Sequence, residues 1–137
     1  MIGDDPGMTA DRPADVVRRL YELRAAGDPG AIRQLLHPEV RWREPEVGDH
    51  MGELRGADAV VDMIERALAA TGGTFSLRVE ATIETESHCA ARIAWTAEKP
   101  GGAVAGHELA VYGIRDGLVS DAAFFPEDLA DDTAFWA

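Results

Sequence analysis

Residues 105–125, AGHELAVYGIRDGLVSDAAFF, carry the strongest fold signal in the chain. The dipeptide Asp116-Gly117 separates two runs of extended character, near residues 105–115 and 118–125. Asp-Gly between two such runs is typical of a two-residue β-hairpin turn, because both turn positions need positive φ angles. The stretch therefore predicts an antiparallel hairpin near the end of the chain.

More strands are expected before this hairpin. Residues 75–80 (FSLRVE) alternate apolar and polar side chains, which is the period of a strand with one buried face. Another extended run lies near 88–98 and is followed by the turn sequence KPGG at 99–102. The second half of the chain therefore predicts an antiparallel meander.

The first half has a helical period instead. Apolar residues recur at helical spacing over residues 13–26, and Gly27 supplies a stop. Asp28 followed by proline predicts the cap of a short helix that runs to residue 36. A third helix is expected over residues 57–71, before a Gly-Gly pair.

Helices followed by a meander predict the α+β class. We expect a cone-shaped curved antiparallel sheet with three N-terminal helices packed on its concave face, and a small-molecule cavity at the wide end. The length of 137 residues and the hydrophobic content of 46% suit one domain over residues 11–137. Residues 1–10 are polar and lack periodicity, so a flexible N-terminus is expected there.

Composition limits the partners and the location. The chain has 25 acidic and 13 basic residues, a formal net charge of −12 and no Lys/Arg cluster. Nucleic acid and anionic membranes are therefore not expected partners. Cys89 is the single cysteine, the start of the sequence lacks a signal-peptide pattern, and no run of about 18 apolar residues occurs. These features predict a cytoplasmic protein.

The sequence contains no pattern that predicts a metal ion or a cofactor. Its four histidines lack H-x-H and H-E-x-x-H spacing. No G-x-G-x-x-G or P-loop sequence occurs, and no serine lies in a G-x-S-x-G turn. We therefore predict neither a metal site nor a bound cofactor.

Residues 41–56, RWREPEVGDHMGELRG, are a candidate pocket wall. Residues i and i+2 of an extended segment share a face, so Trp42 and Glu44 point one way and the arginines beside them point the other. Pro45 supports the extended conformation. We expect Glu44 to face a cavity, where loss of hydration beside the indole raises its pKa and suits it to proton transfer. The alternative is a structural ion pair with Arg43, Arg55 or Arg92.

Several stretches together resemble a known family. They are VVRRLYELRAAGD, LLHPEVRWREPEVGDHMGELRGADAV, TGGTFSLRVE, VYGIRDGLV and FFPEDLADDTAFWA. Over about residues 13–136 the chain resembles the SnoaL-like branch of the nuclear transport factor 2-like superfamily. That superfamily includes polyketide cyclases, ketosteroid isomerases, epoxide hydrolases, dehydratases and non-catalytic binding modules. The resemblance therefore implies the fold and a pocket, and it leaves the reaction open.

The resemblance also assigns positions. Glu44-Pro45 matches the acidic residue that serves as the proton-shuttling base in the steroid isomerases. The hydrogen-bond donors of those enzymes correspond to Leu20 and Ala110, which have no donor, and Tyr21 lies about 100° away round the helix. Steroid isomerase activity itself is therefore not expected.

Other candidate site residues are less distinctive. His50 is a candidate general acid or hydrogen-bond donor, or else a solvated loop side chain. Alternation places Glu108 on one strand face with Tyr112 and leaves His107 on the opposite face. Buried aromatic and methionine residues are either pocket lining or plain core. The candidate catalytic residues are Glu44 and His50, and the candidate ligand-binding residues are Leu20, Trp42, Met63, Trp95, Glu108 and Tyr112.

These observations predict a hydrophobic small-molecule ligand, polyketide-like or terpenoid-like, and a cofactor-independent acid/base enzyme of cyclase, isomerase or hydrolase type. The alternative is a non-catalytic ligand-binding or dimeric interaction module. The resemblance and the apolar residues on both faces of the later strands predict a homodimer through the sheet. The aromatic tail Phe135-Trp136 is expected to dock on the domain.

Overall fold

The structure, a computed structural model, describes residues 12–47, 50–128, 130 and 134, with residues 45–47, 50 and 51 described as backbone only. The predictions for residues 1–10 and for Phe135-Trp136 lie outside the described residues. The elements, in chain order, are α1 (Pro13–Ala25), α2 (Pro29–Ile32), a 3-10 turn (Arg33–Leu35), β1 (Leu36–Val47), β2 (His50–Arg55), α3 (Ala57–Ala70), β3 (Ser76–Glu84), β4 (His88–Lys99), β5 (Gly102–Arg115) and β6 (Leu118–Pro126).

The helix boundaries follow local chemistry. Gly27 has a φ of 73° just after α1, a conformation that glycine adopts without steric cost. The Asp28 side chain accepts a hydrogen bond of 3.2 Å from the backbone N–H of Ala31 and so caps α2. Leu36 begins β1 instead of ending the second helix as predicted. The proline at position 38 favours extended backbone at the residue before it, and the strand therefore starts early.

The predicted hairpin is confirmed. Asp116 and Gly117 have φ angles of 55° and 75°, and they join β5 to β6. Positive φ at both central residues is the signature of the type I′ turn, whose twist matches that of the strands it connects. Aspartate and glycine are among the residues that tolerate this backbone, which is why the dipeptide is such a strong signal.

One curled sheet of six strands carries the fold, in the order β2-β1-β6-β5-β4-β3. The α+β class and the cone-like architecture are as predicted. The sheet is mixed, however, because β1 and β6 pair in parallel, with Trp42 beside Ala122. The other four pairings are antiparallel. Parallel neighbours need a long connection, and here the chain from β2 to β5 supplies it.

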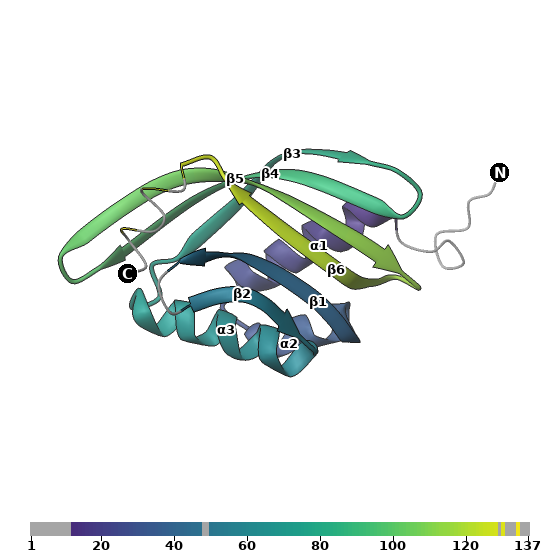
Figure 1. Cartoon of the computed structure of the whole chain (residues 1–137), viewed down its shortest axis with the longest axis horizontal. Coiled ribbons are helices and arrows are strands. Elements are labelled where there is room, and N and C mark those ends of the chain that lie inside the picture. The colour runs from purple at the N-terminus through teal and green to yellow at the C-terminus, as the bar shows by residue number, and fades with distance from the viewer. Residues whose placement is uncertain (1–11, 48–49, 129, 131–133, 135–137) are drawn as a thin grey trace.

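The helices cover one face of the sheet, called the inner face below (Figure 1). Helix α1 lies against β3, β4 and β5, and α3 lies against β1 and β2. The β4–β5 hairpin extends past the helices (Figure 1). No helix in the described part of the chain is long and apolar enough to cross a membrane.

Successive side chains along each strand point alternately to the inner and the outer face of the sheet. In β4 the inner side chains are buried, from Cys89 to Ala97, and the residues between them are exposed or half-buried. The opposite, outer face has three large exposed apolar side chains, namely Ile83, Leu109 and Phe125. The core therefore lies between the helices and the inner face.

Candidate functional site

Trp42 and Glu44 lie on the inner face of β1, as their spacing predicts. Trp42 is completely buried, whereas Glu44 is half-buried. The indole Nε1 donates a hydrogen bond of 2.8 Å to Oε2 of Glu44. The pairing of β1 with β2 becomes irregular between Glu44 and Val47. Glu44 therefore lies where the regular pairing of β1 with β2 ends, and the indole holds its carboxylate.

The arginines that could have neutralised Glu44 pair with other carboxylates. Arg43 contacts Asp121 at 3.1 Å. Arg55 contacts Glu53 at 2.7 Å, and Arg92 pairs with Glu80. These three arginines therefore each contact a carboxylate other than Glu44, and the role of Glu44 stays a prediction.

Aromatic rings surround the Trp42 indole. Its ring centroid lies 4.9 Å from that of Phe124 and 6.0 Å from that of Tyr112. Tyr112 is fully buried, and its hydroxyl lies 2.6 Å from the hydroxyl of Tyr21 on α1. Only one of the two hydroxyl protons is needed for this bond, so the other can be donated to a further acceptor.

Two carboxylates act on this tyrosine pair. Burial raises the pKa of both Tyr21 and Tyr112, and the negative charge of Glu108 raises both further. The charge of Glu44 also raises the pKa of Tyr21. The two hydroxyls are therefore neutral at neutral pH, and Glu44 and Glu108 are near enough for their charges to act on Tyr21.

This burial predicts a loss of stability in alkali. Unfolded tyrosine titrates near about 10, and the folded pair titrates higher, so unfolding releases protons above that pH and stability falls by about 1.4 kcal/mol per pH unit for each tyrosine. Below pH 10 this contribution is fully present. Urea denaturation between about pH 9 and 11 measures the slope. Tyr21→Phe should reduce the slope, whereas the control Ile83→Ala, at an exposed side chain with no titrating group, should leave it; equal slopes in wild type and Tyr21→Phe would contradict the prediction.

The remaining predicted residues are spread over the interior. Leu20 is fully buried, and Met63 packs half-buried against the same core. Glu108 is half-buried on the inner face of β5. The backbone of His50 opens β2, but its side chain lies outside the described residues. The structure thus brings Trp42, Glu44, Glu108 and Tyr112 towards one region, and the roles assigned to all these residues stay predictions.

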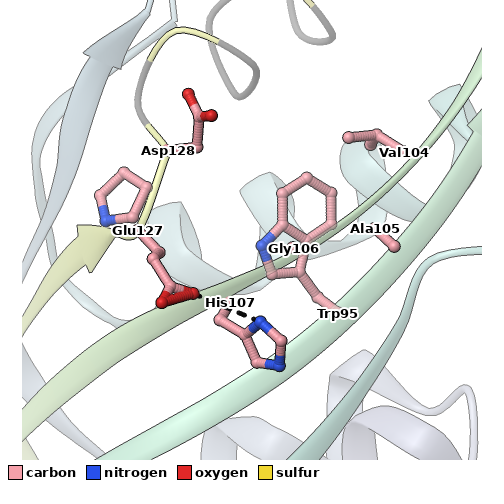
Figure 2. Close-up of a pocket in the computed structure, with 8 residues that line it drawn as sticks. Trp95, Val104, Ala105, Gly106, His107, Glu127 and Asp128 are labelled. Carbon is pink, nitrogen blue, oxygen red and sulfur yellow. Dashed lines mark ion pairs between the residues drawn. The ribbon is translucent and has the colours of Figure 1, made fainter.

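Trp95 lies in a different place. It forms a second buried cluster with Ala97, against which Phe75, Leu77 and Val104 pack. It also lines a pocket of about 350 Å³ at the edge of β5, together with Val104, Ala105, Gly106, His107, Pro126, Glu127 and Asp128 (Figure 2). We call this the β5-edge pocket. His107 faces away from Glu108, as predicted, and its ring lies 3.4 Å from carboxylate oxygens of both Glu80 and Glu127.

Tyr21 is the main residue that the sequence analysis missed. The prediction compared position 20 with the family donor and set Tyr21 aside because it lies about 100° round the helix. The buried stripe of α1 is wide enough to include both, since Val16, Val17, Leu20 and Tyr21 are all buried. The i, i+4 spacing of Val17 and Tyr21 could have predicted that Tyr21 lies on the buried face of this helix.

Comparison with known proteins identifies the class. The SnoaL-like domain family matches residues 17–122, which is most of the chain. The chain therefore belongs to the SnoaL-like family. None of the curated proteins matches it significantly.

Solved structures agree with this assignment. Bal32a, from a soil-derived mobile gene cassette, is 25% identical with a TM-score of 0.88, and the match covers 93% of this chain and 98% of that one. TerC, co-crystallised with polyporic acid, is 17% identical with a TM-score of 0.78 over 91% and 98% of the two chains. IdmH from Streptomyces antibioticus, a proposed polyketide cyclase, is 16% identical with a TM-score of 0.75 over 93% and 100%. At such identities the last two show the shared fold.

Proposed function

We propose that this protein is a small-molecule pocket protein that acts as a cofactor-independent acid/base enzyme, of cyclase, isomerase or hydrolase type, on a hydrophobic polyketide-like or terpenoid-like metabolite. In this proposal Glu44 moves the proton. Glu108 is the second titratable group of the site, and His50 stays a candidate acid. We place the reaction in the cytoplasm, consistent with the single, buried, free thiol of Cys89.

The observation that carries the proposal is the position of Glu44. A half-buried carboxylate beside aromatic side chains is partly stripped of water yet open to a ligand. The hydrogen bond from the Trp42 indole to Oε2 fixes the position of the side chain. A positioned carboxylate of this kind is what proton abstraction next to a carbonyl group requires.

The nature of the ligand is supported by the surroundings and by two structural neighbours. The rings of Trp42, Tyr112 and Phe124 give the site an apolar, aromatic character. TerC, which has the same fold, was co-crystallised with polyporic acid, and IdmH is a proposed polyketide cyclase. A planar or polycyclic hydrophobic skeleton with a carbonyl group fits this setting.

Native mass spectrometry of the protein purified from its own host tests the ligand class. We expect a hydrophobic molecule of low mass to co-purify, because aromatic walls retain such ligands through purification. Its mass and fragmentation would identify the skeleton. A polar, highly charged ligand in its place would contradict the proposed substrate class.

A second candidate function is a dimeric, non-catalytic ligand-binding module. Leu109 and Phe125 face each other across β5 and β6 on the outer face and are 45% and 56% exposed. Ile83, on β3, is 75% exposed on the same face. Large apolar side chains grouped in this way mark interaction surfaces, and a second copy of the sheet offers a matching one. The homodimer is compatible with either function.

Charge introduced on the outer face should therefore separate the subunits. We expect wild type to sediment as a dimer at micromolar concentration and Phe125→Glu to sediment as a monomer, because a carboxylate facing its symmetry-related copy is costly to bury. The control Ala69→Glu adds the same charge at an exposed position of α3. A monomeric wild type, or a dimer that survives Phe125→Glu, would refute the interface.

A further inference from the structure

The β5-edge pocket is built where two strands part. The last pairing of β5 with β6 joins Glu108 to Pro126, and the backbone N–H of Glu127 then donates a hydrogen bond of 2.8 Å to the carbonyl of His107. Beyond this point β5 continues beside β4, and the chain after β6 turns away from it. The resulting hollow, about 350 Å³, is within the size range of small-molecule sites.

An indole forms one wall of this pocket. Figure 2 shows the Trp95 ring beside Gly106, with Val104 on one side and Asp128 on the other. A Cβ at Gly106 would lie 3.3 Å from Nε1 of Trp95, so the glycine lets the ring approach the strand backbone closely. Trp95 belongs to its own buried cluster, separate from the one that contains Trp42. The pocket is therefore distinct from the Glu44 site.

The charges of the pocket favour a positively charged ligand. Glu127 and Asp128 line it, and its described lining residues include no lysine or arginine; Arg92, outside the lining, lies 3.7 Å from Glu127. The chain as a whole carries a net charge of −12, which repels anions at long range. Carboxylates next to an indole are the usual recognition elements for organic cations, because the ring face and the carboxylates both attract positive charge.

We propose that the β5-edge pocket binds a small organic cation, an ammonium group on an apolar or aromatic skeleton. The ammonium group pairs with one acidic side chain of the pocket, Asp128 or Glu127, whose carboxylates point apart in Figure 2, and the skeleton lies against Trp95, Val104 and Pro126. This ligand differs in charge from the hydrophobic metabolite proposed for the Glu44 site. The proposal does not depend on that function.

His107 and Arg92 lie beside the Glu127 carboxylate. The two ring nitrogens of His107 each lie 3.4 Å from a carboxylate oxygen, one of Glu80 on β3 and one of Glu127 after β6. Arg92 on β4 also contacts both, at 3.7 Å from Glu127, and Arg78 contacts Glu80 at 3.1 Å.

Titrations with three phenyl compounds test the proposal. The probes are 2-phenylethylammonium, the uncharged 2-phenylethanol and the anion 3-phenylpropionate, each followed by calorimetry and by amide and indole NMR shifts at about pH 8. We expect the ammonium compound to shift the signals of Gly106 and the Trp95 indole N–H, and to bind at least about tenfold more tightly than the alcohol. The anion should not bind. Equal affinities for all three, or shifts confined to other parts of the molecule, would overturn the proposal.

Matched double variants distinguish binding in the β5-edge pocket from a general effect of the net charge of the protein. Glu127→Gln combined with Asp128→Asn should weaken ammonium binding at least about tenfold and leave binding of the alcohol unchanged. The control is Glu86→Gln with Asp116→Asn, which makes the same chemical changes in two exposed turns at the other end of the sheet. Identical losses in both double variants would show a non-specific charge effect and refute the site.

The variant Glu44→Gln should bind the ammonium probe like wild type, so a failure of the Glu44 site leaves this test intact.

Discussion

Replacing Glu44 with glutamine is expected to lower turnover by roughly 10²–10⁴-fold and to leave ligand affinity nearly unchanged. Glutamine keeps the size of the side chain and can still accept the hydrogen bond from the Trp42 indole through its amide oxygen. It cannot take up a proton from the substrate. The change therefore removes the chemistry and preserves the pocket, and the measurement is kcat and Kd for the ligand that mass spectrometry identifies.

The control for this experiment is Glu39→Gln, which makes the same change at an exposed position on the same strand. We expect it to keep the wild-type kcat. A Glu44→Gln variant that turns over at the wild-type rate would exclude Glu44 as the base. A protein that binds the ligand in both forms and transforms it in neither is the non-catalytic module.

Local sequence patterns specify much of this fold and one important feature of the site. The Asp116-Gly117 turn and the glycine after α1 act through their own backbone angles, so neighbouring residues are enough to predict them. The shared face of Trp42 and Glu44 follows from the two-residue period of a strand, and the hydrogen bond between them confirms it. Periodicity therefore predicts which residues of one helix or strand share a face, but not which elements lie next to each other.

Other features depend on which strands meet, and the local pattern does not contain this information. The parallel pairing of β1 with β6 joins residues that are about eighty positions apart. The β5-edge pocket exists because β6 ends opposite Glu108 while β5 continues. The sequence analysis named Trp95 as a ligand-binding residue but had no means of placing Glu127 and Asp128 beside it. The bond between Tyr21 and Tyr112 is missing from the predictions for the same reason.

Trp42 should matter more to stability than any other residue of the site. It is the largest side chain in the fully buried part of the core, it contacts the rings of Tyr112 and Phe124, and its indole N–H holds Glu44. Trp42→Ala removes all of these contacts and leaves a cavity that the sheet cannot close without moving. The expected cost is about 3–5 kcal/mol in the free energy of unfolding, measured by urea denaturation.

Two further variants show how much of that cost comes from packing and how much from the hydrogen bond to Glu44. Ile83→Ala, at a side chain that is 75% exposed, is the control and should change stability by less than about 1 kcal/mol. Trp42→Phe keeps a ring in the core but removes the donor to Glu44, so it should cost less than the alanine variant and remain folded. If the hydrogen bond contributes, Trp42→Phe should cost less stability in the Glu44→Gln background than in wild type, because a bond to a charged group is worth about 1.5–3 kcal/mol and one to a neutral amide less. Equal costs in the two backgrounds would mean that Trp42 acts through packing alone, and that the position of Glu44 is set by the strand.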